Sequence, residues 1–279
     1  MPRLHAPLGD GEVAITFVGH ATFLIQIDGL AILTDPVWSD CAGPFNLFGP
    51  KRYRKPGVDF GALPKIDLVL LSHNHYDHLD KATLRNLKSA FSPTICFAAG
   101  DARLVAPLGF NDMHELDWWD ETSFADKLKI TFTPAQHSSA RGLHDRHKSL
   151  WGGYMIESRG RRIYFSGDTG YATHFSDIRA RLGSPDIALL PIGAYEPRWF
   201  MTPIHCNPAE AVRAHRDLGS KQSIGMHFGT FQLTTEAIDQ PVIDLKAALA
   251  ESGIAESEFV TQPEGETIIY EVPPAGRQL

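Results

Sequence analysis

Residues 66–80 read IDLVLLSHNHYDHLD, a nearly all-apolar run that ends abruptly in polar residues. An apolar run of this length without alternation is typical of a strand buried on both faces of a sheet. Three imidazoles and one carboxylate follow within six residues, and imidazole nitrogen and carboxylate oxygen are the usual non-thiolate ligands of zinc. Alternation predicts that His73 and His75 lie on one side of the extended strand end, whereas the turn after Tyr76 moves Asp77 and His78 to a neighbouring position. The pattern therefore predicts two adjacent metal positions.

Clustered histidines can also belong to a solvated loop or to a single structural metal site. Four ligand-type side chains at this spacing, placed inside the chain after an apolar strand, favour the metal interpretation.

The flanking sequence predicts an α/β fold. Residues 13–36 hold three apolar runs broken by tight-turn residues, which is typical of a β-meander, and residues 36–64 form a Pro-, Gly- and aromatic-rich ordered loop. Further strands are expected near 94–98, 128–133, 151–157, 161–166, 186–190 and 222–227, and helices over 81–89, from Asp101, and near 174–182, 208–218 and 242–252. Strands followed by strand–helix units predict sheets packed together with helices outside. Because no linker or repeat interrupts this order, we expect one domain over residues 1–279.

Composition excludes several classes of protein. The hydrophobic fraction of 43% and charged fraction of 21% are typical of a globular chain, and the net charge of −7 disfavours a nucleic-acid partner. Cys41, Cys96 and Cys206 are too widely spaced for a thiolate zinc knuckle or a disulfide scaffold. No secretion signal or membrane-spanning run is evident, so we expect a cytoplasmic protein and leave open a peripheral membrane location.

The motif HxHxDH at 73–78 resembles the signature of the metallo-β-lactamase superfamily. The segments GHATFLIQIDG, LTDP, FGPKRYR, LLSHNHYDHLD, PAQH, SGDTGY, IGAYEPRWFM and HFGTF, in this order, resemble the N-acylphosphatidylethanolamine-hydrolysing phospholipase D family over residues 15–233. The resemblance implies the αβ/βα sandwich of this superfamily, with two central mixed sheets flanked by helices.

The resemblance also implies two Zn²⁺ ions per chain, replaceable by iron or manganese. The implied ligands are His73, His75 and His137 for one metal, Asp77, His78 and His227 for the second, and Asp168 bridging them. Taken alone, Asp168 could merely form a turn and His227 could be a core histidine. The lack of an HxExD pattern argues against the di-iron redox branch of the fold.

Catalytic roles are implied for Asp77, which would orient the attacking water or take its proton, and for His205, which would contact a substrate phosphate or protonate the leaving oxygen. Substrate contacts are implied at Tyr76, Tyr195 and His205, although Tyr76 could equally be a packed aromatic. His20, within GHAT, is expected to stabilise a turn rather than to be a metal ligand.

Residues 51–55, KRYRK, place four cations in five positions of the aromatic-rich loop. They could bind a phosphate or an anionic membrane, or form a solvated basic loop, and the sequence leaves both interpretations open.

The leading hypothesis is a zinc-dependent phosphodiesterase that releases N-acylethanolamine and phosphatidic acid from N-acylphosphatidylethanolamine or a related phospholipid. The alternative is a lactonase or another small-substrate hydrolase of the same fold, because paired metals activate water against carbonyl and phosphoryl centres alike. A non-enzymatic metal-binding scaffold is disfavoured, because a scaffold needs no open metal pair. The expected partner is a phospholipid or other phosphodiester substrate, and a homodimer is left open.

Overall fold

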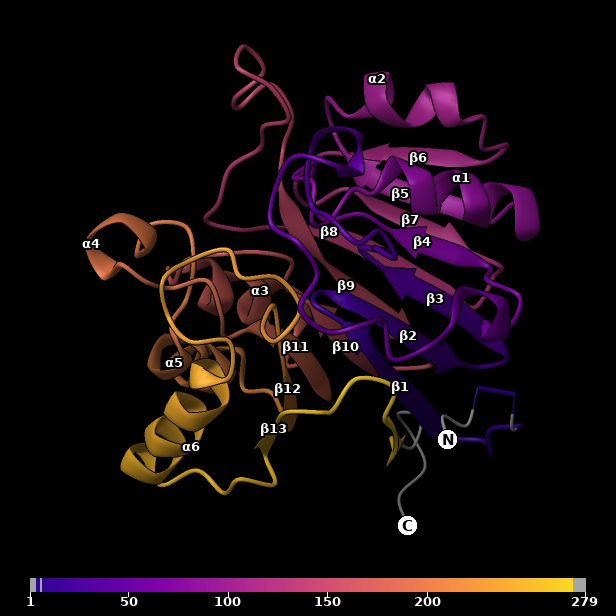
Figure 1. The fold of residues 1–279 in the computed structure, drawn as a ribbon. Coiled ribbons are helices and arrows are strands. Elements are labelled where there is room, and N and C mark those ends of the chain that lie inside the picture. The colour runs from indigo at the N-terminus through magenta and orange to yellow at the C-terminus, as the bar shows by residue number, and fades with distance from the viewer. Residues whose placement is uncertain (1–3, 6, 273–279) are drawn as a thin grey trace.

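The computed structural model describes residues 4–5 and 7–272 and contains two seven-stranded sheets packed face to face (Figure 1). The first sheet has the strand order β14-β1-β2-β3-β4-β5-β6, and the second has the order β13-β12-β11-β10-β9-β8-β7. Both sheets are mixed, because each combines parallel and antiparallel pairs, such as β3 with β4 and β1 with β2 in the first and β10 with β11 and β8 with β9 in the second. The sandwich of two mixed sheets is confirmed.

The strands of the first sheet are β1 (Glu12–Gly19), β2 (Thr22–Ile27), β3 (Leu30–Thr34), β4 (Leu68–Leu70), β5 (Thr94–Ala98), β6 (Met113–Leu116) and β14 (Thr267–Glu271). Those of the second are β7 (Glu121–Phe124), β8 (Leu128–Pro134), β9 (Gly152–Ser158), β10 (Arg161–Phe165), β11 (Ile187–Pro191), β12 (Gln222–Met226) and β13 (Phe259–Val260). The α-helices are α1 (Lys81–Ala90), α2 (Ala102–Val105), α3 (His174–Leu182), α4 (Arg198–Met201), α5 (Pro208–Leu218) and α6 (Gln240–Ser252), with short 3-10 turns at Pro44–Asn46, Phe60–Ala62 and Ala106–Leu108.

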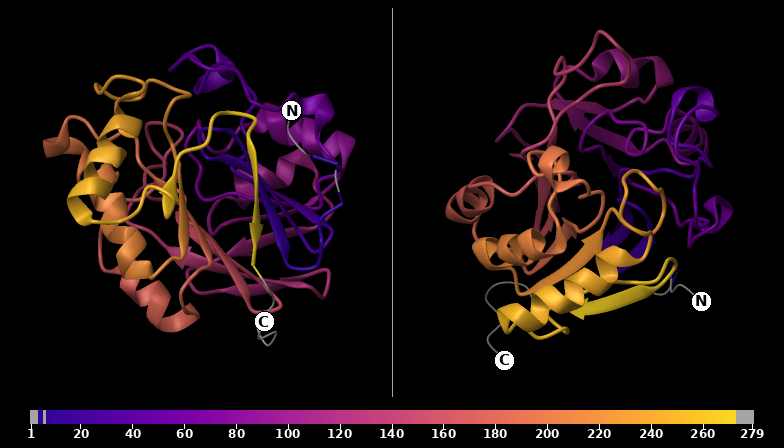
Figure 2. Two further views of the ribbon diagram at one scale, coloured as in Figure 1. Left: turned by 90° about the horizontal axis from the view of Figure 1, so that it is seen from below. Right: turned by 60° about the vertical axis from the view of Figure 1, so that its left-hand side comes forward.

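Helices cover the outer faces of the sandwich. The helices α1 and α2 lie over the first sheet (Figure 1), and α5 and α6 lie side by side against the second (Figure 2). In the part of the chain that the structure describes, no helix is both long and apolar enough to cross a bilayer.

The strand β4 shows why the apolar run at 66–71 does not alternate with polar residues. Leu68 and Leu70 belong to the main core between the sheets, whereas Val69 and Leu71 pack in a second core together with Leu84 of α1. Both faces of the strand are therefore buried, as the sequence predicts.

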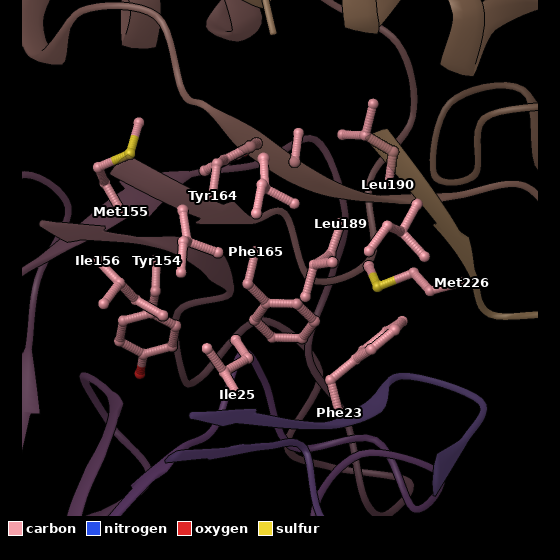
Figure 3. Packing of buried hydrophobic residues seen from close by; sticks show 14 of the residues in the cluster. Phe23, Ile25, Tyr154, Met155, Ile156, Tyr164, Phe165, Leu189, Leu190 and Met226 are labelled. Carbon is pink, nitrogen blue, oxygen red and sulfur yellow. The ribbon is translucent and has the colours of Figure 1, made fainter. Parts of the chain in front are cut away.

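The main core draws residues from both sheets, and Phe23 and Ile25 of the first sheet face Tyr154 and Phe165 of the second (Figure 3). This shared core is compatible with one folding unit, and the single domain over 1–279 stays a prediction.

Some expected boundaries were wrong. The strand before the histidines ends at Leu70, so His73 and His75 lie on a loop rather than on an extended strand end. The sequence pattern also misses the short elements β6, β7, β13, β14 and α4, whose two to five residues give too little periodicity to recognise.

Candidate metal centre

The predicted ligands gather at one edge of the sandwich because each follows the carboxyl end of a strand. His73 follows β4, His137 follows β8, Asp168 follows β10 and His227 follows β12. Since β10, β11 and β12 are parallel, and β3 and β4 are parallel, their carboxyl ends lie at the same edge of their sheets. The topology therefore brings together residues that are far apart in the sequence.

Three imidazoles form the first group. Nδ1 of His75 lies 2.9 Å from Nε2 of His73 and 3.2 Å from Nε2 of His137. The three nitrogens lie close to one another, which is the arrangement expected around a shared cation.

The second group contains Asp77, His78 and His227. Oδ2 of Asp77 lies 3.4 Å from Nε2 of each histidine. Oδ2 of Asp168 lies 3.1 Å from Nε2 of His78 and 3.0 Å from Nε2 of His227. The same oxygen lies 3.8 Å from Nε2 of His137 in the first group, so Asp168 stands between the two groups.

The chemistry of these residues fits a pair of cations. Nε2 of His78 and Nε2 of His227 are buried and, within the described residues, make no hydrogen bond of good geometry although Oδ2 of Asp168 is near, and the buried Oδ1 of Asp168 makes none. Leaving such atoms unpaired is costly unless they bind something else. Separations of 2.9–3.4 Å between ligand atoms are also close to the edge of a tetrahedron, about 3.3 Å for metal–nitrogen bonds of 2.0–2.1 Å.

A surrounding layer of hydrogen bonds orients the imidazoles. Nδ1 of His137 lies 2.8 Å from the carbonyl oxygen of Ile204, and Nδ1 of His78 lies 2.6 Å from the carboxylate of Asp35. With Nδ1 engaged outward, Nε2 of both rings faces the centre, which is the usual arrangement of metal-binding histidines. Asp35 belongs to the LTDP segment, and sequence reasoning assigns it no role.

The loops that carry the ligands are tied to one another around Thr169. Its hydroxyl oxygen accepts from the backbone N–H of Gln136, and its carbonyl accepts from the N–H of Cys206. Gly167, the residue before Asp168, permits a close approach to the loop of Ser72, because a Cβ on Gly167 would lie 2.6 Å from Cβ of Ser72 and the backbone has a φ of +58°. Replacing this glycine would push Asp168 away from the His73 loop.

His20 lies inside the centre. Its ring is buried, and Nε2 lies 2.9 Å from Oδ2 of Asp77. Its carbonyl also accepts from the N–H of His227. His20, Asp35 and His227 all have positive φ values, between 32° and 61°, a conformation that non-glycine residues adopt rarely and mostly where surrounding contacts enforce it. The expectation that His20 only stabilises a turn is therefore too narrow, since its ring contacts a proposed ligand.

Burial and charge set the protonation states of the centre. Burial, followed by the neighbouring imidazoles, lowers the pKa of His73 well below its usual value. Burial also lowers the pKa of His137, against the charge of Asp168. Burial opposes the charged form of His227 as well, but the carboxylates of Asp168 and Asp77 raise its pKa to about 9. Burial alone would raise the pKa values of Asp77 and Asp168. The facing histidines outweigh burial and lower both pKa values well below the usual range. Ionised carboxylates and neutral imidazoles are the forms that bind a cation, and a bound cation would take the place of the proton that the carboxylates favour on His227.

Of the other predicted site residues, His205 lies beside the proposed ligands, whereas the hydroxyls of Tyr76 and Tyr195 bond to other parts of the fold. Nδ1 of His205 lies 4.0 Å from Oδ2 of Asp168, and its ring stacks on His227 with centroids 5.2 Å apart. The hydroxyl of Tyr195 instead donates to Asp244 in α6. The hydroxyl of Tyr76 donates to the carbonyl of Arg141. Both tyrosine hydroxyls are thus engaged in the fold, and their contact with substrate stays a prediction.

The basic residues of the 51–55 segment are divided between the fold and the solvent. Arg52 donates to the carbonyls of Val37 and Ser39, and Arg54 pairs with Asp239. Lys51, Tyr53 and Lys55 are exposed. For the two arginines, the structure favours a role in holding the loop to the fold.

Comparison with known proteins identifies the family. A model of the beta-lactamase superfamily domain matches residues 31–228, which include strands β4 to β12 and every proposed ligand. The chain belongs to the metallo-β-lactamase superfamily. A metallo hydrolase from the hyperthermophilic archaeon Ignicoccus hospitalis superposes with a TM-score of 0.70, covering 93% of this chain and 99% of its own at 24% identity.

Two relatives within this superfamily belong to one family of phospholipases. N-acyl-phosphatidylethanolamine-hydrolyzing phospholipase D 1 of Caenorhabditis elegans is 40% identical over 263 residues, which cover 90% of this chain and 74% of the relative. The mitochondrial N-acyl-phosphatidylethanolamine-hydrolyzing phospholipase D of Saccharomyces cerevisiae is 37% identical over 266 residues, which cover 91% of this chain and 56% of the yeast protein. The resemblance to this phospholipase family is therefore confirmed, and the chain is a metal-dependent hydrolase of the metallo-β-lactamase fold. Because the yeast relative is named as mitochondrial, the cytoplasmic location stays a prediction.

Proposed function

We propose that this protein is a phospholipase D-type phosphodiesterase that releases N-acylethanolamine and phosphatidic acid from N-acylphosphatidylethanolamine or a related phospholipid. The observation that carries the proposal is the position of His205, a buried imidazole that is not among the proposed ligands. Its Nδ1 lies 4.0 Å from Oδ2 of Asp168 and, within the described residues, has no hydrogen-bond partner. A polar atom that is buried and unpaired beside the metal ligands is suited to a substrate oxygen. The identity of 40% to the nematode phospholipase supports the same substrate class.

The metal ligands proposed are His73, His75 and His137 for one ion, Asp77, His78 and His227 for the other, and Asp168 for both. Two zinc ions held there would lower the pKa of a water and stabilise the attacking and leaving oxygens of a phosphoryl transfer.

The protein's own residues would then position the reactants. Asp77 would orient the attacking water or accept its proton, while His20 holds its carboxylate through a contact of 2.9 Å. His205 would contact the phosphate or protonate the departing alkoxide. Its backbone is fixed, because Arg198 donates to its carbonyl and pairs with Glu210 at 2.7 Å.

The decisive experiment combines a substrate panel with isotope labelling. Metal-loaded protein is offered N-acylphosphatidylethanolamine, other phospholipids and lactones, in water enriched in the heavy oxygen isotope. Attack at phosphorus places the label in phosphatidic acid, whereas label in the released ethanolamide alcohol would mean carbon–oxygen cleavage and would contradict the proposed reaction. Turnover of lactones alone would replace it with the small-substrate alternative.

A variant tests the role of His205. We expect His205→Asn to lower turnover of the phospholipid by about 10²-fold while metal content stays the same, because His205 lies beside Asp168 but is not among the proposed ligands. The matched control is His144→Asn at an exposed loop position, which should keep full activity. Equal activity of the two variants would remove His205 from the reaction.

A further inference from the structure

A cavity of about 410 Å³ is lined on one side by Tyr76, and none of the proposed metal ligands lines it. Its walls come from three segments, which are residues 43–46 of the long loop, residues 76–85 from the histidine motif into α1, and Arg141. Since Tyr76 stands between His75 and Asp77 in the sequence, the cavity adjoins the metal centre but is distinct from it.

The walls of the cavity carry an excess of positive charge. Lys81, Arg85 and Arg141 line it, and within the described residues none of them lies within salt-bridge distance of a carboxylate. The acid in the wall, Asp80, is buried and already accepts hydrogen bonds from Ser39, Ala82 and Thr83. Among residues 4–5 and 7–272, the three cations therefore line the cavity without a carboxylate in salt-bridge contact.

Arg141 is held in place for binding rather than left mobile. One of its nitrogens, Nη1, donates to the carbonyls of Asn74 and Leu79, and its guanidinium lies 3.8 Å from the ring centroid of Tyr76. A guanidinium fixed by its backbone contacts loses little entropy when it binds an anion through its remaining N–H groups.

The cations also repel one another. Burial, followed by the charges of Arg141 and Arg85, lowers the pKa of Lys81. Three like charges facing one cavity repel one another, and a bound anion would compensate them.

We propose that this cavity binds the phosphate group of an organic phosphate, separate from the group that is hydrolysed at the metal centre. Phosphate fits because its several oxygens accept charge-assisted hydrogen bonds from guanidinium and ammonium groups at the same time. The wall also carries Phe45, whose side chain is 87% exposed, so an amphiphilic phosphate such as a phospholipid can place its apolar part against an aromatic ring. The inference does not depend on the proposed phosphodiesterase activity, because it concerns binding at residues outside the metal centre.

Binding to two probes tests the proposal and separates the two sources of phosphate. The probes are vesicles of phosphatidylcholine containing phosphatidylglycerol, compared with phosphatidylcholine alone, and soluble glycerol phosphate. We expect the double variant Lys81→Glu/Arg85→Glu to bind at least tenfold more weakly than the unmodified chain to whichever of the two probes the unmodified chain binds. The charge-matched control is Lys88→Glu/Lys246→Glu, which has the same net charge but alters residues outside the cavity, and it should bind as the unmodified chain does.

The outcomes are distinct. Loss confined to vesicles assigns the cavity to a phospholipid headgroup, and loss with glycerol phosphate assigns it to a soluble organic phosphate. Binding that persists equally in both double variants, or absent binding in both arms, overturns the proposal. If the double variant fails to fold, Arg85→Ala at an exposed position of α1 provides the same comparison against Lys88→Ala.

Discussion

Oδ2 of Asp35 lies 2.6 Å from Nδ1 of His78, and both side chains are completely buried. The carboxylate of Asp35 also accepts from the backbone N–H and the hydroxyl of Ser72, the residue before His73. Asp35 thereby fixes the loop that carries the first histidines and turns Nε2 of His78 toward Asp168. A contact of this kind sets both the orientation and the basicity of a metal-binding imidazole.

The first prediction follows from that contact. Replacing Asp35 by Asn keeps the shape of the side chain but removes its charge, so we expect metal affinity to fall by about 10- to 100-fold. Competition with a chromophoric chelator measures the change. Asp67→Asn is the control, because Asp67 accepts a backbone hydrogen bond and pairs with Lys65 away from the centre. Equal affinity of the two variants would show that Asp35 does not support the metals.

The second prediction concerns the shared position of Asp168. Because its Oδ2 lies near nitrogens of both ligand groups, Asp168→Ala should weaken both metals together. His227→Ala, which alters one group, should leave the other metal bound. Elemental analysis after dialysis against a weak chelator distinguishes loss of both metals from loss of one, and an Asp168→Ala chain that keeps a full complement would contradict the bridging role.

The third prediction concerns His20. Burial and the neighbouring His227 lower the pKa of His20 to about 3, so at neutral pH the ring is a neutral donor toward Asp77. His20→Gln can keep an N–H donor, whereas His20→Gly removes it and tolerates the φ of +59°. We expect kcat to fall more in the Gly variant than in the Gln variant, with KM little changed. A loss in kcat that is equal in the two variants, or larger in the Gln variant, would show that the donor to Asp77 is not needed for turnover.

The sequence predicts the fold and the gathering of the ligand-type residues well because both depend on strong local signals. The unbroken apolar run at 66–71 requires a strand covered on both faces, and HxHxDH concentrates imidazoles and a carboxylate at a spacing that is rare without a metal. Asp168 and His227 are ordinary residues in isolation, and only the order of motifs along the chain marks them as candidate ligands. The structure places Oδ2 of Asp168 3.0 Å from Nε2 of His227.

Contacts that depend on loop conformation could not be predicted in this way. His20 and Asp35 act through loop conformations with positive φ, and such conformations leave no periodicity in the sequence. Similarly, a run such as KRYRK does not reveal that Arg52 folds inward while Lys51 stays in solvent, because this depends on carbonyls brought near by the long loop.

The fourth prediction tests that difference within the basic segment. Arg52→Met removes the donors to the carbonyls of Val37 and Ser39 and the contact of the guanidinium with Phe231, so it should destabilise the fold by about 2 kcal/mol. Lys51→Met at an exposed position should change the free energy of unfolding by less than about 0.5 kcal/mol. Denaturant titration measures the free energy of unfolding of both variants. Similar changes in the two would show that the contacts of Arg52 do not stabilise the fold.

The fifth prediction concerns pH. Burial raises the pKa of Asp101 from 3.8 to about 6, although Asn74 donates a hydrogen bond of 2.7 Å to it. Because the folded-state pKa is the higher one, this group favours the folded state below about pH 4, and that contribution is lost as pH rises through about 6. A shift of roughly two units corresponds to about 3 kcal/mol. Asp101→Asn carries no titrating proton and can still accept a hydrogen bond from Asn74. The free energy of unfolding of the variant, relative to that of the unmodified chain, should therefore increase as pH rises from about 4 to 7. Parallel stability curves for the two proteins, measured by denaturant titration at fixed metal concentration, would show that Asp101 does not titrate in this range.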